Sequence, residues 1–126
     1  MNEQSVKKYL LHKPESTLDY PFGSDVAVFK IKNKMFATFG ILKEMEAINL
    51  KCEPNEALAL RDIFKSVIPG YHMNKRHWNT VYLDQSVPKG EIERMIDNSY
   101  ALVVKGLKKS ERDNLILQYG RENIEL

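Results

Sequence analysis

One segment of the chain, from Pro69 to Val81, gathers most of the side chains that could carry chemistry. It reads Pro-Gly-Tyr-His-Met-Asn-Lys-Arg-His-Trp-Asn-Thr-Val and holds two of the three histidines and the only tryptophan. Four side chains that carry positive charge or donate protons lie within six residues: His72, Lys75, Arg76 and His77. Tyr71 and Trp78 flank them. Cations interleaved with aromatic rings suit a nucleic acid, because the cations pair with phosphates and the rings stack on bases.

Three other interpretations of this segment stay open. It fits a structural loop, because Trp78 can anchor a loop to the core and asparagines commonly cap turns. It also fits a protein- or peptide-binding adaptor, in which Tyr71, His72 and Trp78 form an anchor pocket. The third is a small-ligand binder or an enzyme that uses His72 or His77 as its acid–base group.

Several other kinds of site find no support in the sequence. His72 and His77 are five residues apart, but no cysteine pair or close acid completes a zinc set, so we expect no metal and no cofactor. The six glycines are scattered, so a glycine-rich phosphate-binding loop is absent. No nucleophile elbow is visible, and the single cysteine, Cys52, falls on the apolar side of its strand. We therefore expect a protein that is not an enzyme.

Composition narrows the class of protein. The 126 residues suit a single domain over 1–126 that buries a core without disulfides or metals. Hydrophobic residues make up 43% and charged residues 29%, which indicates a globular chain, and a net charge of +2 is only mildly basic. One cysteine allows no intrachain disulfide, and no apolar segment has the length of a signal peptide or membrane span. We expect a cytoplasmic protein with no membrane partner.

Hydrophobic periodicity predicts the elements that position the Pro69–Val81 segment. Strands are expected at 26–32, 35–41, 46–52 and 78–83, and helices at 2–12, about 54–66, Val87–Pro88 to about 105, and 110–119. Tight turns between the first three strands indicate an antiparallel meander, so the predicted fold is α+β with helices packed on one face of the sheet. Residues 14–25 are expected to form a loop that packs Tyr20 or Phe22 onto the core. Ser110 is expected to cap the last helix, and 121–126 to be a frayed tail.

Blocks along almost the whole chain resemble the MmcQ/YjbR family of small bacterial proteins. They are Tyr20–Gly23, Lys34–Ala37, Leu50–Pro54, Pro69–Val81, Val87–Pro88, Ser99–Tyr100 and Leu102–Val103. The resemblance implies a CyaY-like fold and a place among "double wing" DNA-binding proteins, in which β-hairpins act as wings. The implied partner is double-stranded DNA.

Wing contacts to phosphate would then come from the first hairpin, through Lys30, Lys32 and Lys34. The Pro69–Val81 segment would supply Tyr71, His72, Lys75, Arg76, His77 and Trp78. DNA binding is the leading functional hypothesis, and the adaptor and small-ligand hypotheses are its rivals. Neither the residues nor the resemblance indicates an oligomeric state, a DNA sequence or a biological process.

Overall fold

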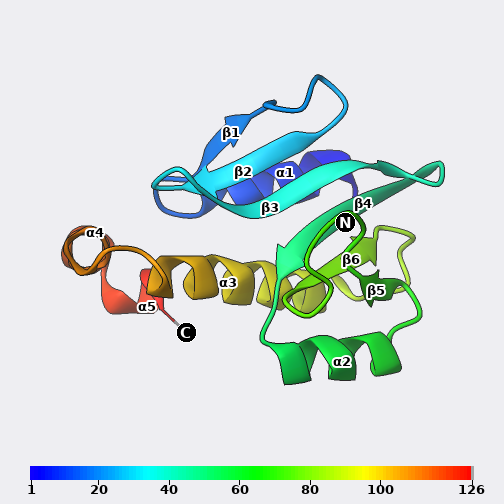
Figure 1. Ribbon diagram of the computed structural model, residues 1–126. Helices are drawn as coiled ribbons and strands as arrows, with labels where there is room; N and C mark the ends of the chain where they lie inside the picture. The colour runs from blue at the N-terminus through cyan, green and yellow to red at the C-terminus, as the bar shows by residue number, and fades with distance from the viewer. Residues whose placement is uncertain (126) are drawn as a thin grey trace.

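A six-stranded antiparallel sheet organises the computed structural model, which describes residues 1–125 (Figure 1). The strands are β1 (Thr17–Asp19), β2 (Ala27–Ile31), β3 (Lys34–Leu42), β4 (Met45–Lys51), β5 (Val67–Pro69) and β6 (Trp78–Tyr82). Their order in the sheet is β1-β2-β3-β4-β6-β5. The predicted α+β class is confirmed, and the four predicted strands are β2, β3, β4 and β6.

The helices lie on one side of this sheet. They are α1 (Glu3–His12), α2 (Pro54–Ile63), α3 (Lys89–Lys105), α4 (Lys109–Tyr119) and α5 (Arg121–Ile124). Helix α3 packs across β2, β3 and β4, α1 packs on β3, and α2 packs beside β5. In Figure 1, α2 and the α4–α5 pair lie toward opposite ends of α3. Within residues 1–125, no helix combines the length and the apolar character that a membrane crossing requires.

Local hydrogen bonds explain where the first two helices begin. The Asn2 side chain accepts a bond from the Ser5 N–H at 2.9 Å, and the Ser5 hydroxyl accepts one from the Asn2 N–H at 2.9 Å. This reciprocal capping box satisfies two of the N–H groups that a helix start leaves free. Glu53 caps α2 in a similar way, because its two oxygens accept bonds from the Asn55 and Glu56 N–H groups, both at 3.0 Å.

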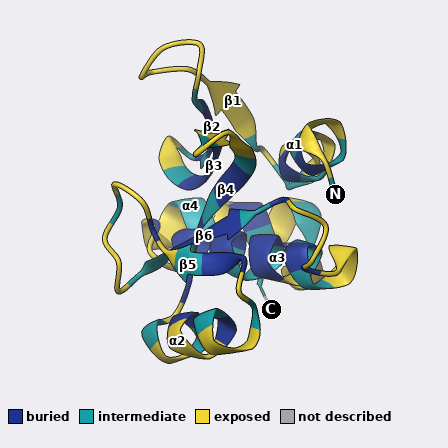
Figure 2. Cartoon of the chain, turned by 90° about the vertical axis from the view of Figure 1, so that its right-hand side faces the viewer, coloured by how far each residue is buried: buried dark blue, intermediate teal, exposed yellow. Residues whose placement is uncertain are grey.

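The core lies between the sheet and α3, and the inner side of α3 is coloured as buried in Figure 2. Phe36 of β3 and Tyr100 of α3 meet edge to face, with ring centroids 5.4 Å apart and an interplanar angle of 89°. The Tyr100 hydroxyl donates a hydrogen bond to the Pro14 carbonyl oxygen at 2.8 Å. Burial raises the pKa of Tyr100 above its usual range, so the ring packs as a neutral phenol.

Ser99 of α3 inserts a hydroxyl between β3 and β4. Phe36 of β3 lies where the pairing of β2 with β3 shifts register, since Phe29 faces Ala37 and Lys30 faces Met35. The buried Ser99 hydroxyl accepts a bond from the Lys51 N–H at 2.9 Å and donates one to the Phe36 carbonyl at 2.6 Å. One side chain of α3 thus satisfies a backbone group on each of two neighbouring strands.

The segment predicted as a loop over 14–25 contains strand β1, which the sequence analysis missed. Its three residues are all exposed, so it has no buried alternation that would reveal it. The expected packing of Tyr20 or Phe22 onto the core is also wrong, since these side chains are 43% and 74% exposed. Figure 2 shows the connection from β1 to β2, to which both residues belong, projecting beyond the sheet.

The boundaries of α2 and α4 also differ from the prediction. Helix α2 ends at Ile63, because the chain turns there into the unpredicted edge strand β5. Helix α4 begins at Lys109, and its N-cap residue Lys108 makes no side-chain capping bond, so Ser110 lies inside the helix and does not cap it.

The predicted frayed tail is instead helix α5. Gly120, with φ of 87°, separates α5 from α4 and allows the chain to turn back. Ile124 is only 2% exposed, and burial of this side chain holds the segment against the core. Leu126, the last residue of the predicted tail, lies outside the described residues.

Asp84 ties the exit of β6 to the entrance of β5. It accepts hydrogen bonds from the hydroxyls of Ser66 and Ser86, the latter at 2.6 Å, and from the Ser86 N–H at 3.0 Å. These bonds, led by the one from Ser66, lower the pKa of the Asp84 carboxyl below its ordinary value of 3.8. The folded state therefore favours the ionised carboxylate.

This arrangement predicts a pH dependence of stability. Because the folded-state pKa is lowered, the contribution of Asp84 is complete above the unfolded value of 3.8 and is lost as the pH falls through the folded value. An Asp84→Asn variant should lose less stability than the wild type between about pH 6 and about pH 3, as measured by urea unfolding. Asp25→Asn, at an exposed position, is the control. An Asp84→Asn variant with an unchanged pH profile would contradict the assignment.

Candidate nucleic-acid interface

The connection between β5 and β6, residues 70–77, is here called the β5–β6 loop. Its base is closed by a hydrogen bond from the Gly70 N–H to the Trp78 carbonyl at 2.8 Å. Inside it, the Met73 N–H donates to the Gly70 carbonyl at 3.3 Å and the His77 N–H to the Asn74 carbonyl at 3.2 Å. The Asn74 side chain also accepts a bond from the Arg76 N–H at 3.0 Å. The loop therefore has a defined backbone, as asparagine turns commonly provide.

Arg61 of α2 anchors this loop, a role that the sequence analysis missed. Its Nε donates to the Asn79 side-chain oxygen at 2.7 Å. Its terminal nitrogen donates to the carbonyls of Lys75 and Trp78, the latter at 3.4 Å. The available signal was its place next to Leu60, at the edge of the apolar stripe of α2. A guanidinium there can reach several loop carbonyls at once, since its N–H groups spread in a fork.

Replacing Arg61 by methionine should loosen the loop, because the carbonyls of Lys75 and Trp78 and the buried Asn79 lose their shared donor. We expect the free energy of unfolding to fall by about 1–3 kcal/mol. Fluorescence of the only tryptophan, Trp78, during urea unfolding reports on this region directly. Lys65→Met, at an exposed position, is the control, and an equal effect of both substitutions would contradict the anchoring role.

The aromatic side chains of the loop are partly exposed. Tyr71 is 43% exposed, and its ring lies against that of His72, with centroids 4.2 Å apart and a tilt of 60°. His72 has a φ of 59°, a left-handed conformation that few residues other than glycine and asparagine adopt readily. Trp78 is half-buried at the start of β6. The rings of Tyr71 and His72 thus present a surface on which a planar group can stack.

The two loop histidines have no visible orienting partner. Among residues 1–125, neither His72 nor His77 makes a side-chain hydrogen bond, so no neighbour fixes the tautomer of either ring. The thiol of Cys52, beside the loop, is not suited to act as a nucleophile either. It is buried, and its burial together with the charges of Glu56 and Glu53 raises the pKa of the thiol to about 11. Within the described part of the chain, no three His, Cys, Asp or Glu side chains cluster as a metal site would require.

The predicted wing lysines are less free than expected. Lys30 lies 3.4 Å from a carboxylate oxygen of Asp19, and Lys32 lies 2.9 Å from one of Glu15. The Glu15 carboxylate raises the pKa of the Lys32 ammonium by accepting its hydrogen bond. Among the described residues, only Lys34 of the three has no carboxylate within ion-pair distance, and it is exposed.

The loop cations keep their charge available. The Lys75 ammonium donates to the Gly70 carbonyl at 3.1 Å, which orients it but does not neutralise it. The Arg76 guanidinium is exposed and, within residues 1–125, makes neither an ion pair nor a side-chain hydrogen bond. Lys51, which the sequence analysis did not select, is the cross-strand partner of Trp78 in the sheet and likewise has no ion pair there.

Strand register brings these cations to one end of the sheet. Lys34 begins β3, Lys51 ends β4 and Trp78 begins β6, and the antiparallel pairing places all three positions at the same end. Because neighbouring strands are about 4.8 Å apart, β3 and β6 are separated by about 10 Å. Lys34, Lys51 and the β5–β6 loop can therefore face one extended ligand.

A row of polar side chains joins the loop to the sheet face that the helices leave uncovered. The Asn49 amide donates to the Thr38 hydroxyl at 3.0 Å, and the Thr80 hydroxyl donates to the Asn49 side-chain oxygen. Thr80 in turn accepts a bond from the Tyr71 N–H at 2.9 Å. Three strands and the first residues of the loop are thus linked by side-chain bonds.

Comparisons with known proteins point in one direction. The family model named YjbR matches residues 11–102. The Escherichia coli O157:H7 protein YbdF is 38% identical over 109 residues, covering 86% of this chain and 89% of YbdF. The protein YjbR of Escherichia coli K12 is 31% identical over 116 residues, covering 92% of this chain and 98% of YjbR.

Solved structures agree with the sequence comparisons. The crystal structure of the Deinococcus radiodurans protein DR2400, which carries the domain DUF419, matches with a TM-score of 0.82 and 35% identity. The match covers 89% of this chain and 86% of DR2400. A crystal structure from Pseudomonas syringae matches with a TM-score of 0.70 and 32% identity, over 81% of this chain and 98% of that one.

Proposed function

This chain belongs to the YjbR family, and we propose that it binds double-stranded DNA through the β5–β6 loop and the neighbouring end of the sheet. The contacts would be made mainly to phosphates. Lys34, Lys51, Lys75 and Arg76 supply the charges, and Tyr71 and His72 belong to the same loop as Lys75 and Arg76. The proposed role is binding without catalysis.

The observation that carries this proposal is the set of uncompensated cations at one end of the sheet. Lys34, Lys51 and Arg76 have no carboxylate within ion-pair distance among residues 1–125, and Lys75 is bonded only to a backbone carbonyl. Such cations favour DNA binding, because each contact between a cationic side chain and a phosphate releases counterions that were condensed on the DNA. Lys30 and Lys32 are weaker candidates, because Asp19 and Glu15 already pair with them.

Fluorescence anisotropy of a labelled DNA duplex, titrated at several salt concentrations, tests the proposal. For the wild type, the logarithm of affinity should fall linearly with the logarithm of salt concentration. The Lys75→Ala/Arg76→Ala variant should bind more weakly, and its slope should be shallower by about 1–2, one unit for each lost phosphate contact. Lys8→Ala removes an exposed cation from α1, on the helix side of the sheet, and should bind like the wild type.

Two results would overturn the proposal. One is the absence of wild-type binding at about 50 mM salt, where phosphate contacts are strong. The other is an equal slope for the double variant and the wild type, which would place any DNA contact away from the loop.

The rival function is recognition of a protein or peptide through Tyr71 and Trp78. The exposure of the Tyr71 ring favours it, because exposed aromatic side chains commonly anchor protein interfaces. Tyr71→Ala separates the two roles. An adaptor should lose binding of its protein partner, whereas a DNA-binding surface should still bind DNA, with its salt slope kept and only the stacking contribution lost.

A further inference from the structure

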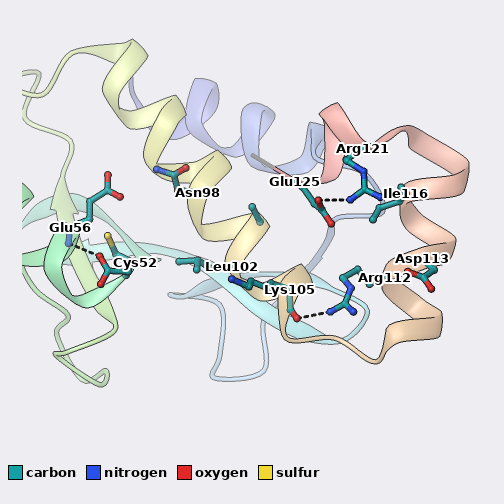
Figure 3. Close-up of a pocket in the computed structure, with 12 residues that line it drawn as sticks. Cys52, Glu56, Asn98, Leu102, Lys105, Arg112, Asp113, Ile116, Arg121 and Glu125 are labelled. Atoms are coloured by element: carbon teal, nitrogen blue, oxygen red, sulfur yellow. Dashed lines mark hydrogen bonds and ion pairs between the residues drawn. The ribbon is translucent and has the colours of Figure 1, made fainter.

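A groove lies on the helix side of the molecule, and of its lining residues Cys52 adjoins the β5–β6 loop, where its N–H donates to the His77 carbonyl. The groove has a volume of about 710 Å³ and is bounded by the start of α2, one side of α3, and the α4–α5 pair. Figure 3 shows Cys52 and Glu56 at one end of this groove and Arg112, Arg121 and Glu125 at the other, with α3 between them. Volumes of about 300–1,000 Å³ are typical of sites for small molecules.

The middle of the groove is apolar. Ala101 and Leu102 of α3 line it, with the Cys52 thiol toward the Glu56 end and Ile116 of α4 toward the other end. Burial is the main cause of the raised pKa of the Cys52 thiol, so this side chain lines the groove as a neutral group. Packing the apolar part of a ligand against these side chains would be favourable, because it removes apolar surface from water.

One end of the groove carries two cations that form no ion pair among residues 1–125, Lys105 and Arg112, beside two acids that are already paired, Asp113 with Lys109 and Glu125 with Arg121. Lys105 is exposed and, among the described residues, has no carboxylate within ion-pair distance. The Arg112 guanidinium donates to the Lys105 carbonyl at 3.0 Å, which holds it at the end of α3 without neutralising it. Arg121 differs, since it pairs with Glu125 at 2.8 Å.

The other end carries acids whose bonding capacity is largely used. Both oxygens of Glu53 accept backbone N–H bonds at the start of α2, which lowers the pKa of its carboxyl. Glu56 lies 2.6 Å from Arg94. The half-buried Asn98 amide lines the groove between the two ends and, within residues 1–125, makes no side-chain hydrogen bond. The charges free to meet a ligand are therefore the cations at Lys105 and Arg112.

From this arrangement we propose that the groove binds a small organic monoanion with an apolar body. The acidic head lies at Lys105 and Arg112, and the body lies over Leu102 and Ile116. Glu53 and Glu56 disfavour a second negative charge at the far end. This site shares no residue with the proposed DNA surface, and the two proposals stand or fall separately.

Octanoate is a suitable probe, because it joins a carboxylate to a saturated chain. In a titration of the wild-type protein followed by ¹H–¹⁵N NMR, amide shifts should concentrate at residues 98–105 and 112–116. Octanedioate should bind more weakly, since its second carboxylate must enter the apolar part of the groove or approach the acids of α2. Shifts confined to other surfaces, or none at millimolar octanoate, would overturn the proposal.

Charge removal locates the head group. Lys105→Gln should weaken octanoate binding about fivefold, the loss expected for one partly exposed ion pair. Lys105 is exposed and its ammonium holds no protein partner among residues 1–125, so the fold should be kept, and unchanged circular dichroism verifies this. Lys89→Gln, an exposed lysine at the start of α3, should bind like the wild type. Equal affinities of Lys105→Gln and the wild type would contradict the site, as would equal binding of octanoate and octanedioate.

Discussion

Replacing Ser99 by alanine is expected to lower the free energy of unfolding by about 2–4 kcal/mol. The substitution removes one hydroxyl that serves two strands, and so leaves the Lys51 N–H and the Phe36 carbonyl without partners. A buried backbone group that loses its hydrogen bond costs about 1–3 kcal/mol, and water has little access because Ser99 is fully buried. Urea unfolding followed by circular dichroism measures the effect.

Ser110→Ala is the matched control for Ser99→Ala. Ser110 also lies in a helix, but it is exposed and makes no side-chain hydrogen bond within the described chain. The two substitutions therefore change the same atoms and differ only in burial and bonding. A small effect at both positions would show that the strands rearrange to pair directly without the hydroxyl.

Replacing Gly70 by alanine should lower the free energy of unfolding by about 2–3 kcal/mol and loosen the β5–β6 loop. A Cβ at this buried position would lie 2.8 Å from the Trp78 Cβ, 2.9 Å from the Trp78 carbonyl oxygen and 3.0 Å from the Met73 Cβ. Two of these contacts are made to β6 at the base of the loop, so relief requires β5 and β6 to move apart. The Gly70–Trp78 hydrogen bond of 2.8 Å would then be lost.

Gly90 offers a contrasting control in the first turn of α3, where an added Cβ meets nothing within 4 Å. Gly90→Ala should raise stability by up to about 1 kcal/mol, because alanine favours the helix and restricts the unfolded chain. Thermal unfolding of both variants, with Trp78 fluorescence as the probe, should show shifts of opposite sign. A stabilised Gly70→Ala variant would mean that the base of the loop is looser than the structure indicates.

Sequence patterns predicted the parts of the fold in which burial repeats regularly. Strand β4 alternates buried and less buried side chains around Ile48 and Leu50, and α3 repeats apolar residues over four turns, so both were found. Strands β1 and β5 have three residues each, too few for any period to appear. They exist because a neighbouring strand offers free backbone groups, a cause that lies outside their own sequence.

For the candidate site, too, the sequence predicts some features and not others. The residues of the β5–β6 loop could be selected by type, because cations and aromatic rings are crowded there. Their partners could not, since the ion pairs of Lys30 with Asp19 and of Lys32 with Glu15 depend on how β1 and the end of α1 fold back. Arg61 and Lys51 were missed because each becomes relevant only through the register of β6.

The polar row from Thr38 through Asn49 to Thr80 has a consequence for how the sheet assembles. Side chains in a strand alternate between faces, so sliding β4 by one residue would turn Asn49 toward the core and Ile48 toward water. Such a slip would bury the Asn49 amide without a hydrogen-bond partner. It would also leave the hydroxyls of Thr38 and Thr80 without their bonds to Asn49. The hydrogen bonds of this row form in only one register of β3, β4 and β6. A sheet with another register is therefore less stable, including while the chain is folding.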